Sequence, residues 1–336
     1  MKKNKHENLF IDLISYAEAS GDKSIENGKK YNDLMKDIID YAEVFGEEKA
    51  IRKFEKLILD LECAELSYKF VKCFEGADVD AHGKIIIDSN DSRWNYRFAR
   101  DIDRADVSSH GLVVINSGVS EFNYLFARDV SGADIKAHEE ALIKSLNPTY
   151  CYLFARDVVG ADIEALGNVV IDSKEAEWNY HFASQVKGSN IKAHEEVVKE
   201  NGKPIDFYFF ARDVEGADVN SLGTKVIDSK DAEVNYYFAR DIDGADIKAH
   251  EKVVFDSKDP MWNYYFAAYV PSADLEAHKK VVQNSLSLKW ISKFNNLINN
   301  ISVSNECEFD EEKYNKNIEY EKTKKIIKKI LSINSR

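Results

Sequence analysis

Histidine is the residue of this sequence whose chemistry is easiest to recognise, because it binds metals and titrates near neutral pH. Six of the eight histidines recur at one position of a repeated segment: His82, His110, His138, His194, His250 and His278. Two other copies carry Leu166 and Leu222 there. Packed helices lie about 8–10 Å apart and Zn–N bonds measure about 2 Å, so equivalent histidines of adjacent copies cannot share a zinc ion. The histidine column therefore indicates packing, and the sequence predicts no metal and no cofactor.

An Arg-Asp dipeptide recurs in the same segment. Its copies are Arg100-Asp101, Arg128-Asp129, Arg156-Asp157, Arg212-Asp213 and Arg240-Asp241. On a helical wheel the pair lies beside the residue that follows a recurring tyrosine. That neighbouring position varies through Lys69, Arg97, Leu125, Leu153, His181, Phe209, Tyr237 and Tyr265.

Two interpretations of this surface remain open. The first is a ladder of ion pairs between neighbouring repeats, each worth little if exposed. The second is a binding ridge, in which arginines recognise carboxylate or phosphate groups and aromatic residues anchor a partner. The candidate binding residues are Arg100, Arg128, Arg156, Arg212, Arg240, Asp129, Asp157, Asp213, Phe209, Tyr237 and Tyr265.

Other chemical patterns are weaker. The loop DIDGAD places Asp241, Asp243 and Asp246 close together, and calcium accepts such ligands, but helix capping also explains them. No P-loop, HExxH, GxSxG or dinucleotide-binding motif occurs. The sequence therefore predicts no catalytic residues and favours a protein that is not an enzyme.

The element that must position these residues is a tandem repeat. Its tyrosine recurs every 28 residues, at Tyr68, Tyr96, Tyr124, Tyr152, Tyr180, Tyr208, Tyr236 and Tyr264. Each copy contains two short amphipathic segments, and Pro148, Pro204 and Pro260 suit the first turn of the first segment. A turn glycine such as Gly132 or Gly244 follows, and then an aspartate placed to cap the second segment.

These patterns predict an all-α fold. A β-solenoid is the alternative at this period, but apolar spacings of three and four residues favour helices. Helices this short are stable only when stacked. We therefore expect a right-handed α-solenoid of eight 28-residue helix-pair repeats with helical caps.

The predicted domains follow from the extent of the repeat. Residues 1–66 form an N-terminal helical cap with helices over 6–20, 29–45 and 47–66, and residues 67–291 form the solenoid. Residues 292–336 contain the rest of a last cap helix, an acidic linker and a basic amphipathic tail helix. Trp290 and Phe294 indicate this cap helix, because they occupy the positions of Trp262 and Phe266.

The repeat unit also carries a resemblance. In architecture it resembles the HEAT and tetratricopeptide classes, although their periods are longer and their characteristic residues are absent. The unit FARDVxGADIxAH is similar to tandem repeats in uncharacterised bacterial and phage-encoded proteins. This resemblance covers residues 68–291 and implies a helical-repeat fold without an established activity.

Composition narrows the function. The 336 residues carry a net charge of −13, which disfavours broad binding to nucleic-acid phosphates and favours a basic protein partner. Four scattered cysteines, no expected signal peptide and no apolar stretch of membrane-spanning length predict a cytoplasmic protein.

We expect an interaction scaffold or adaptor that binds an extended, basic protein along the repeats. One alternative is an acidic decoy that inhibits a nucleic-acid-binding protein in phage–host conflict. The other is a nucleic-acid or nucleotide binder that uses the arginine column.

Overall fold

The computed structural model describes residues 24–301, and within this range it contains α-helices and no strand. We call the helices that carry the recurring tyrosine, and α20 after them, A helices. They are α4 (Ala64–Cys73), α6 (Ser92–Asp101), α8 (Ser120–Asp129), α10 (Pro148–Asp157), α12 (Ala176–Gln185), α14 (Pro204–Asp213), α16 (Ala232–Asp241), α18 (Pro260–Tyr269) and α20 (Leu288–Ile301).

The B helices carry the position of the recurring histidine. They are α5 (Val79–Asp88), α7 (Val107–Ser117), α9 (Ile135–Ser145), α11 (Ile163–Asp172), α13 (Ile191–Asn201), α15 (Val219–Ser229), α17 (Ile247–Asp256) and α19 (Leu275–Asn284). Two further helices, α2 (Ser24–Phe45) and α3 (Glu47–Asp60), precede them.

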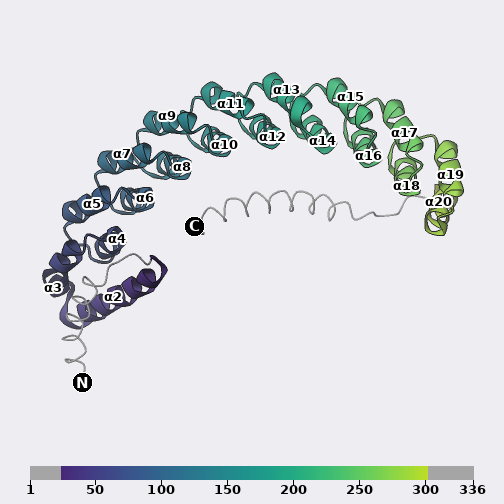
Figure 1. Ribbon diagram of the computed structural model, residues 1–336. Coiled ribbons are helices and arrows are strands. Elements are labelled where there is room, and N and C mark those ends of the chain that lie inside the picture. Colours follow the sequence, from purple (N-terminus) through teal and green to yellow (C-terminus); the bar gives the residue numbers. More distant parts are fainter. Residues whose placement is uncertain (1–23, 302–336) are drawn as a thin grey trace. The chain divides into compact units, whose positions relative to one another are not determined.

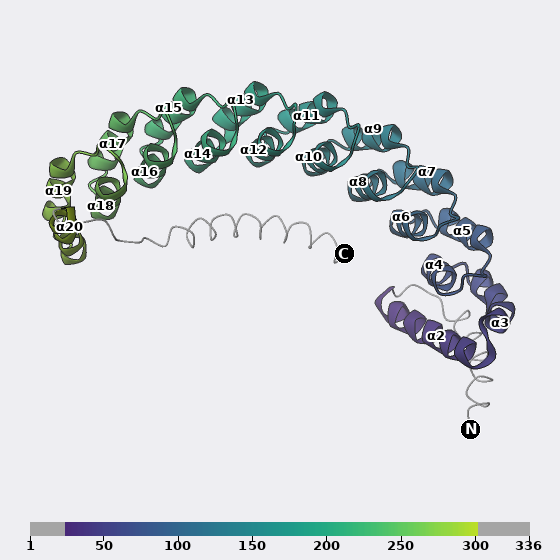
Figure 2. The same cartoon turned by 180° about the vertical axis from the view of Figure 1, so that it is seen from behind.

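The described residues divide into two compact units, one of the residues up to 229 together with 241–245, and the other of residues 230–240 together with those from 246 on. In the first unit, successive A helices from α4 to α14 pack on one another, and so do B helices from α5 to α13 (Figures 1 and 2). Each A helix also packs on the B helix that follows it. In the second unit α17 packs on α19 and α18 on α20 in the same manner. The prediction of an all-α chain built from tandem helix pairs is confirmed, and the packing between neighbours is that of a solenoid.

Helix starts follow the capping residues that the sequence predicts. Asp134 and Asp246 accept hydrogen bonds from the backbone N–H groups of Ala137 and Ala249, at 3.1 Å each, and so begin α9 and α17. The prolines Pro148, Pro204 and Pro260 occupy the first turn of their A helices. The last aspartate of these acidic loops, such as Asp246, is therefore a helix cap.

The turn between the helices of a pair depends on glycine. The α8 helix ends at Asp129, and Gly132 then adopts a φ of 82°, in the left-handed region that favours glycine. Gly160, Gly188, Gly216 and Gly244 have φ values between 83° and 88°. The predicted left-handed glycines are confirmed, although each helix ends three residues earlier than its glycine.

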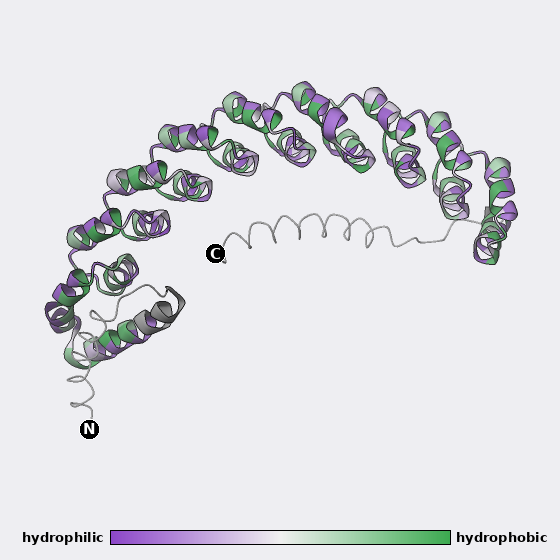
Figure 3. Ribbon diagram, viewed as in Figure 1, coloured by the Kyte–Doolittle hydropathy of each residue, from purple (hydrophilic) through white to green (hydrophobic). Residues whose placement is uncertain are grey.

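The core contains one phenylalanine from every A helix. Each is at most 1% exposed: Phe70, Phe98, Phe126, Phe154, Phe182, Phe210, Phe238, Phe266 and Phe294. The six recurring histidines are buried to the same degree. Hydrophobic and hydrophilic residues both occur along the helices, as expected for elements that bury one face (Figure 3).

The N-terminal helices differ from the prediction. The prediction of a single helix over 47–66 is wrong, because α3 ends at Asp60 and α4 begins at Ala64. Glu62 lies between them with a φ of 46°. The helix expected over 29–45 is present as α2. The helix predicted to follow the last repeat is confirmed as α20, in which Phe294 is 1% exposed. The helix predicted over 6–20 and the basic tail helix lie outside the described residues.

Candidate binding surface

The recurring arginines are held by groups on their own helices. In α8, Arg128 donates from Nε to Asp129 Oδ1 at 2.6 Å, from Nη2 to Asp129 Oδ2 at 2.8 Å, and from Nη1 to the Tyr124 hydroxyl at 2.8 Å. The guanidinium carbon lies 4.9 Å from the centre of the Tyr124 ring. Arg100, Arg156 and Arg212 make the same three contacts. The Arg-Asp ion pair therefore lies within one helix.

The tyrosine hydroxyl makes the connection between repeats. Tyr96 donates to Asp129 Oδ2 at 2.6 Å, and Tyr124 donates to Asp157 Oδ2 at 2.5 Å, each across a sequence separation of 33 residues. Tyr180 and Tyr208 donate in the same way to Asp213 and Asp241. We call the tyrosines, arginines and aspartates on α6 to α14, together with Asp241 at the end of α16, the Tyr-Arg-Asp row. It links neighbouring A helices, as the ladder interpretation expects, but through tyrosine instead of a salt bridge.

Two A helices of the first unit depart from the row. In α4, Lys72 replaces the arginine and donates to Asp101 and to the Tyr68 hydroxyl, both at 2.8 Å. In α12, Ser184 and Gln185 replace the Arg-Asp pair, so the Tyr152 hydroxyl donates to the neutral Gln185 Oε1 at 2.7 Å.

Electrostatics keep the row in its charged, paired form. The hydrogen bonds from Arg128 and Arg156 hold the pKa values of Asp129 and Asp157 below their usual range, although partial burial opposes this. Burial raises the pKa of Tyr124, and the bond to Asp157 raises it further. The Arg128-Asp129 and Arg156-Asp157 pairs are thus each neutral as a unit across the physiological pH range.

The predicted anchor residues differ in exposure. Phe209 and Tyr237 are buried, at 8% and 5% exposed, with Arg212 stacked 4.7 Å from the Phe209 ring and Arg240 5.1 Å from the Tyr237 ring. Tyr265 is half-buried beside Trp290. Side chains of the row's arginines are 32–38% exposed. Among the predicted binding residues of the first unit, the arginines are therefore partly exposed, whereas Phe209 is buried.

The buried histidines form a second ordered set, together with asparagines that our sequence analysis missed. His110 Nδ1 lies 2.7 Å from Asn95 Oδ1. The same pairing joins Asn123 to His138, Asn179 to His194, Asn235 to His250 and Asn263 to His278, always 15 residues apart. Burial lowers the pKa of His110, His138, His194 and His250 to about 4.

A signal for these pairs was present in the sequence. The two repeats that replace histidine by Leu166 and Leu222 also replace the asparagine, by Cys151 and Phe207. No group of three or more His, Cys, Asp or Glu side chains within residues 24–301 is arranged to hold a metal ion.

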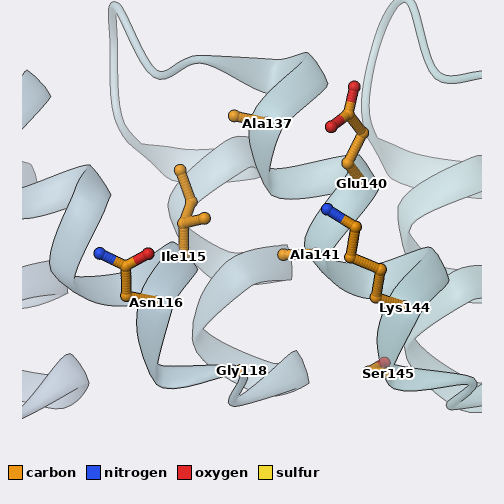
Figure 4. Close-up of a pocket in the computed structure, with 8 residues that line it drawn as sticks. All are labelled: Ile115, Asn116, Gly118, Ala137, Glu140, Ala141, Lys144 and Ser145. Atoms are coloured by element: carbon orange, nitrogen blue, oxygen red, sulfur yellow. The ribbon is translucent and has the colours of Figure 1, made fainter.

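Hollows in the surface lie between neighbouring B helices. One of about 430 Å³ is lined by Ile115 and Asn116 of α7 and by Ala137, Glu140 and Lys144 of α9 (Figure 4). A second of about 280 Å³ lies between α5 and α7. Neither contains a residue of the Tyr-Arg-Asp row.

Comparisons with known proteins give no family for this chain: no protein-family model, curated protein or solved structure matches it. The class it defines by its own geometry is that of a helical-repeat protein. No helix within residues 24–301 has the length and apolar character needed to cross a membrane.

Proposed function

We propose that the chain is a cytoplasmic protein-interaction scaffold, in which eight 28-residue repeats form a right-handed stack and the Tyr-Arg-Asp row binds an extended partner. The single observation that carries this proposal is the fixed spacing of the row. From α6 to α10, every A helix presents an oriented guanidinium that its own tyrosine and aspartate hold in place. Orientation before binding reduces the entropy lost on association.

The arginines retain capacity for a partner. A guanidinium has five N–H groups, and three of them are used by the aspartate and tyrosine of each row. The arginine side chains are partly exposed, and their remaining N–H groups suit carbonyl or carboxylate oxygens of an extended chain. The position after each tyrosine, which changes from Arg97 through Leu125 and Leu153 to His181, supplies a different neighbour at each step.

Charge favours a basic protein over a nucleic acid. The chain carries a net charge of −13, which attracts cationic partners and repels phosphates. Each arginine of the row is neutralised by the adjacent aspartate. Phosphate binding by the arginine column would have to compete with that carboxylate.

The test compares two triple variants in co-purification from the native cell, followed by mass spectrometry. Arg128→Gln, Arg156→Gln and Arg212→Gln together remove three charges from the row. Lys136→Gln, Lys192→Gln and Lys248→Gln remove three charges from exposed positions on B helices. We expect the arginine variant to lose the partner and the lysine variant to keep it. Retention of every partner by a folded arginine variant contradicts the proposal.

Salt separates the scaffold from the decoy. An acidic decoy depends on long-range charge, so its affinity falls steeply as sodium chloride rises from about 50 to about 300 mM, by about tenfold or more. A partner held by oriented hydrogen bonds and packing loses much less. Measuring the affinity of the co-purified partner over this range decides between them.

A further inference from the structure

In the groove between neighbouring B helices, the protein binds carboxylate groups of its own glutamates. Glu139, Glu195 and Glu251 cross this groove, and Glu55 of α3 crosses the equivalent groove between α3 and α5. Each accepts a hydrogen bond from the backbone N–H of a residue 23 positions later, which caps the next B helix. For Glu139 the donor is Asp162, at 2.6 Å. We call each such place a groove site. It consists of the position that glutamate occupies here, the backbone N–H of the capping residue, and the buried residue four positions after the cap.

At two groove sites the carboxylate also approaches a histidine. Glu251 Oε1 lies 3.3 Å from His278 Nε2, and Glu55 Oε1 lies 3.7 Å from His82 Nε2. Both histidine side chains are fully buried. The molecule itself thus shows a carboxylate between a helix-capping N–H and an imidazole.

Three groove sites of the first unit have glycine where these sites have glutamate. The glycines are Gly83, Gly111 and Gly167, and the facing histidines are His110, His138 and His194. A Cβ atom at each glycine would lie 3.5–3.6 Å from the Nε2 of its histidine, so the ring nitrogen points toward the glycine. Each Nε2 is buried and has no hydrogen-bond partner among the described residues.

The capping N–H is present at these sites as well. Asp106, Asp134 and Asn190 are the caps, and their side chains bond the third residue of the helix, as Asp106 does to Ser109 N at 3.1 Å. Within residues 24–301 no acceptor bonds the backbone N–H of Asp106. The glycine sites therefore retain both groups that surround the carboxylate elsewhere.

The protonation of His110 follows from its asparagine. Asn95 donates through Nδ2 to the carbonyls of Ile86 and Asp91, at 2.8 and 2.9 Å, which turns its Oδ1 toward His110 Nδ1. Nδ1 therefore carries the hydrogen and Nε2 carries a lone pair. A carboxyl group satisfies this nitrogen only when it brings a proton with it.

The hollow of about 280 Å³ between α5 and α7 gives access to the first of these sites. It is lined by Val79, Asp80, Gly83, Lys84, Ile87, Phe98, Asp106 and His110. Lys84 is the cation of this lining, and the Asp106 carboxylate is occupied by Ser109 N and Oγ. Phe98 and Asn95, the groups that α6 places against the imidazole, do not titrate.

We propose that this hollow binds a small carboxylate with one oxygen placed as Glu251 Oε1 is, facing both the capping N–H and the imidazole. This oxygen accepts from the Asp106 N–H and shares a proton with His110 Nε2. The sites at Gly111 and Gly167 repeat the arrangement. The inference does not rest on the proposed scaffold function, because the groove site lies on B helices and contains no residue of the Tyr-Arg-Asp row.

Acetate is the probe, and the full chain with ¹⁵N-labelled histidine is the sample. We expect acetate to shift the His110 Nε2 resonance saturably, while sodium chloride at equal ionic strength does not. Because one proton enters with the anion, the acetate affinity should rise about tenfold per unit of pH decrease between about pH 7 and pH 5.5. The proposal is overturned if acetate and sodium chloride shift the His110 Nε2 resonance equally. It is also overturned if neither salt shifts it, as expected when Nε2 binds only water.

Gly83→Glu provides the matched variant, because Glu251 occupies the equivalent position of its repeat, where Phe266 packs on His278 as Phe98 packs on His110. The new carboxylate should occupy the groove site, so that His110 loses its acetate response while His138 and His194 keep theirs. Gly83→Gln fills the same space without a carboxylate and is the control. We expect Gly83→Glu to shift the His110 Nε2 resonance and Gly83→Gln not to shift it in this way. An undiminished acetate response of His110 in a folded Gly83→Glu chain also overturns the proposal.

Discussion

Two neighbouring helix pairs differ in the polarity of the two side chains that meet in their core. In the α8–α9 pair, Asn123 and His138 meet in a buried hydrogen bond of 2.9 Å. In the α10–α11 pair, Cys151 and Leu166 occupy the same positions, and both are fully buried. The α14–α15 pair repeats the second solution with Phe207 and Leu222. The core thus accepts a polar pair or an apolar pair, and both partners change together.

The physical reason is the cost of a buried polar group without a partner. Asn123 also donates to the carbonyl of Val114 at 3.2 Å, and Cys151 keeps a weaker version of this bond to Leu142 at 3.8 Å. A mixed pair would leave one ring nitrogen or amide oxygen unsatisfied. The first repeat is the exception: Ser67 stands in the place of asparagine, and both Ser67 Oγ and His82 Nδ1 lack hydrogen-bond partners among the described residues.

The largest effect expected of a single substitution comes from breaking a polar pair. Asn123→Leu removes the acceptor of His138 Nδ1 and the donor to Val114, and should lower the free energy of unfolding by about 3 kcal/mol. Urea denaturation followed by circular dichroism measures it. Phe207→Leu places the same residue at the equivalent position of an apolar pair and should cost only about 1 kcal/mol. Equal losses in the two variants would refute the distinction between the pairs.

Converting one pair type into the other should restore most of this loss. The double variant Asn123→Cys with His138→Leu copies the α10–α11 core, and we expect it to be about 1 kcal/mol less stable than the parent. Each single substitution should cost more than the double one, because each leaves a buried polar group unpaired. A double-mutant cycle by urea denaturation measures the coupling. Additive losses would show that the two residues do not act as a pair.

Acid should weaken the polar pairs selectively. Burial lowers the pKa of His138 from 6.5 to about 4, so the unfolded chain binds a proton that the folded chain excludes. Stability is therefore lost as the pH falls from about 6.5 to about 4, by roughly 3 kcal/mol for each such histidine. The Asn123→Cys/His138→Leu variant lacks one of these groups and should lose less. Parallel pH profiles of the parent and this variant would contradict the assignment.

The sequence was sufficient for the elements that depend on local chemistry. The 28-residue period, the proline and aspartate starts and the left-handed glycines were all predicted because each follows from a single residue type at a fixed spacing. The break between α3 and α4 was not predicted. It depends on Glu62 adopting a positive φ of 46°, which no glycine or proline announces.

The partners of individual side chains were harder to predict. Periodicity identified the arginine and histidine columns, but it does not say where each side chain points. Residues adjacent in a helix do not normally face each other, so the bond of Arg128 to Asp129 at the end of α8 was unexpected. The link from Tyr124 to Asp157 depends on how two A helices are offset, which only the packed structure defines.

The smallest expected effect concerns the strength of the tyrosine hydrogen bond between neighbouring A helices. It tests whether this bond is weaker for Tyr152 of α10 than for Tyr124 of α8. The Tyr124 hydroxyl donates to the charged Asp157, whereas Tyr152, beside Cys151, donates to the neutral Gln185. Hydrogen bonds to charged groups are stronger, so Tyr124→Phe should cost about 1.5 kcal/mol and Tyr152→Phe about 0.5–1 kcal/mol in unfolding free energy. Gln185→Asp should then raise the cost of Tyr152→Phe toward that of Tyr124→Phe. If Gln185→Asp leaves the cost of Tyr152→Phe unchanged, the charge of the acceptor does not set the strength of the link between repeats.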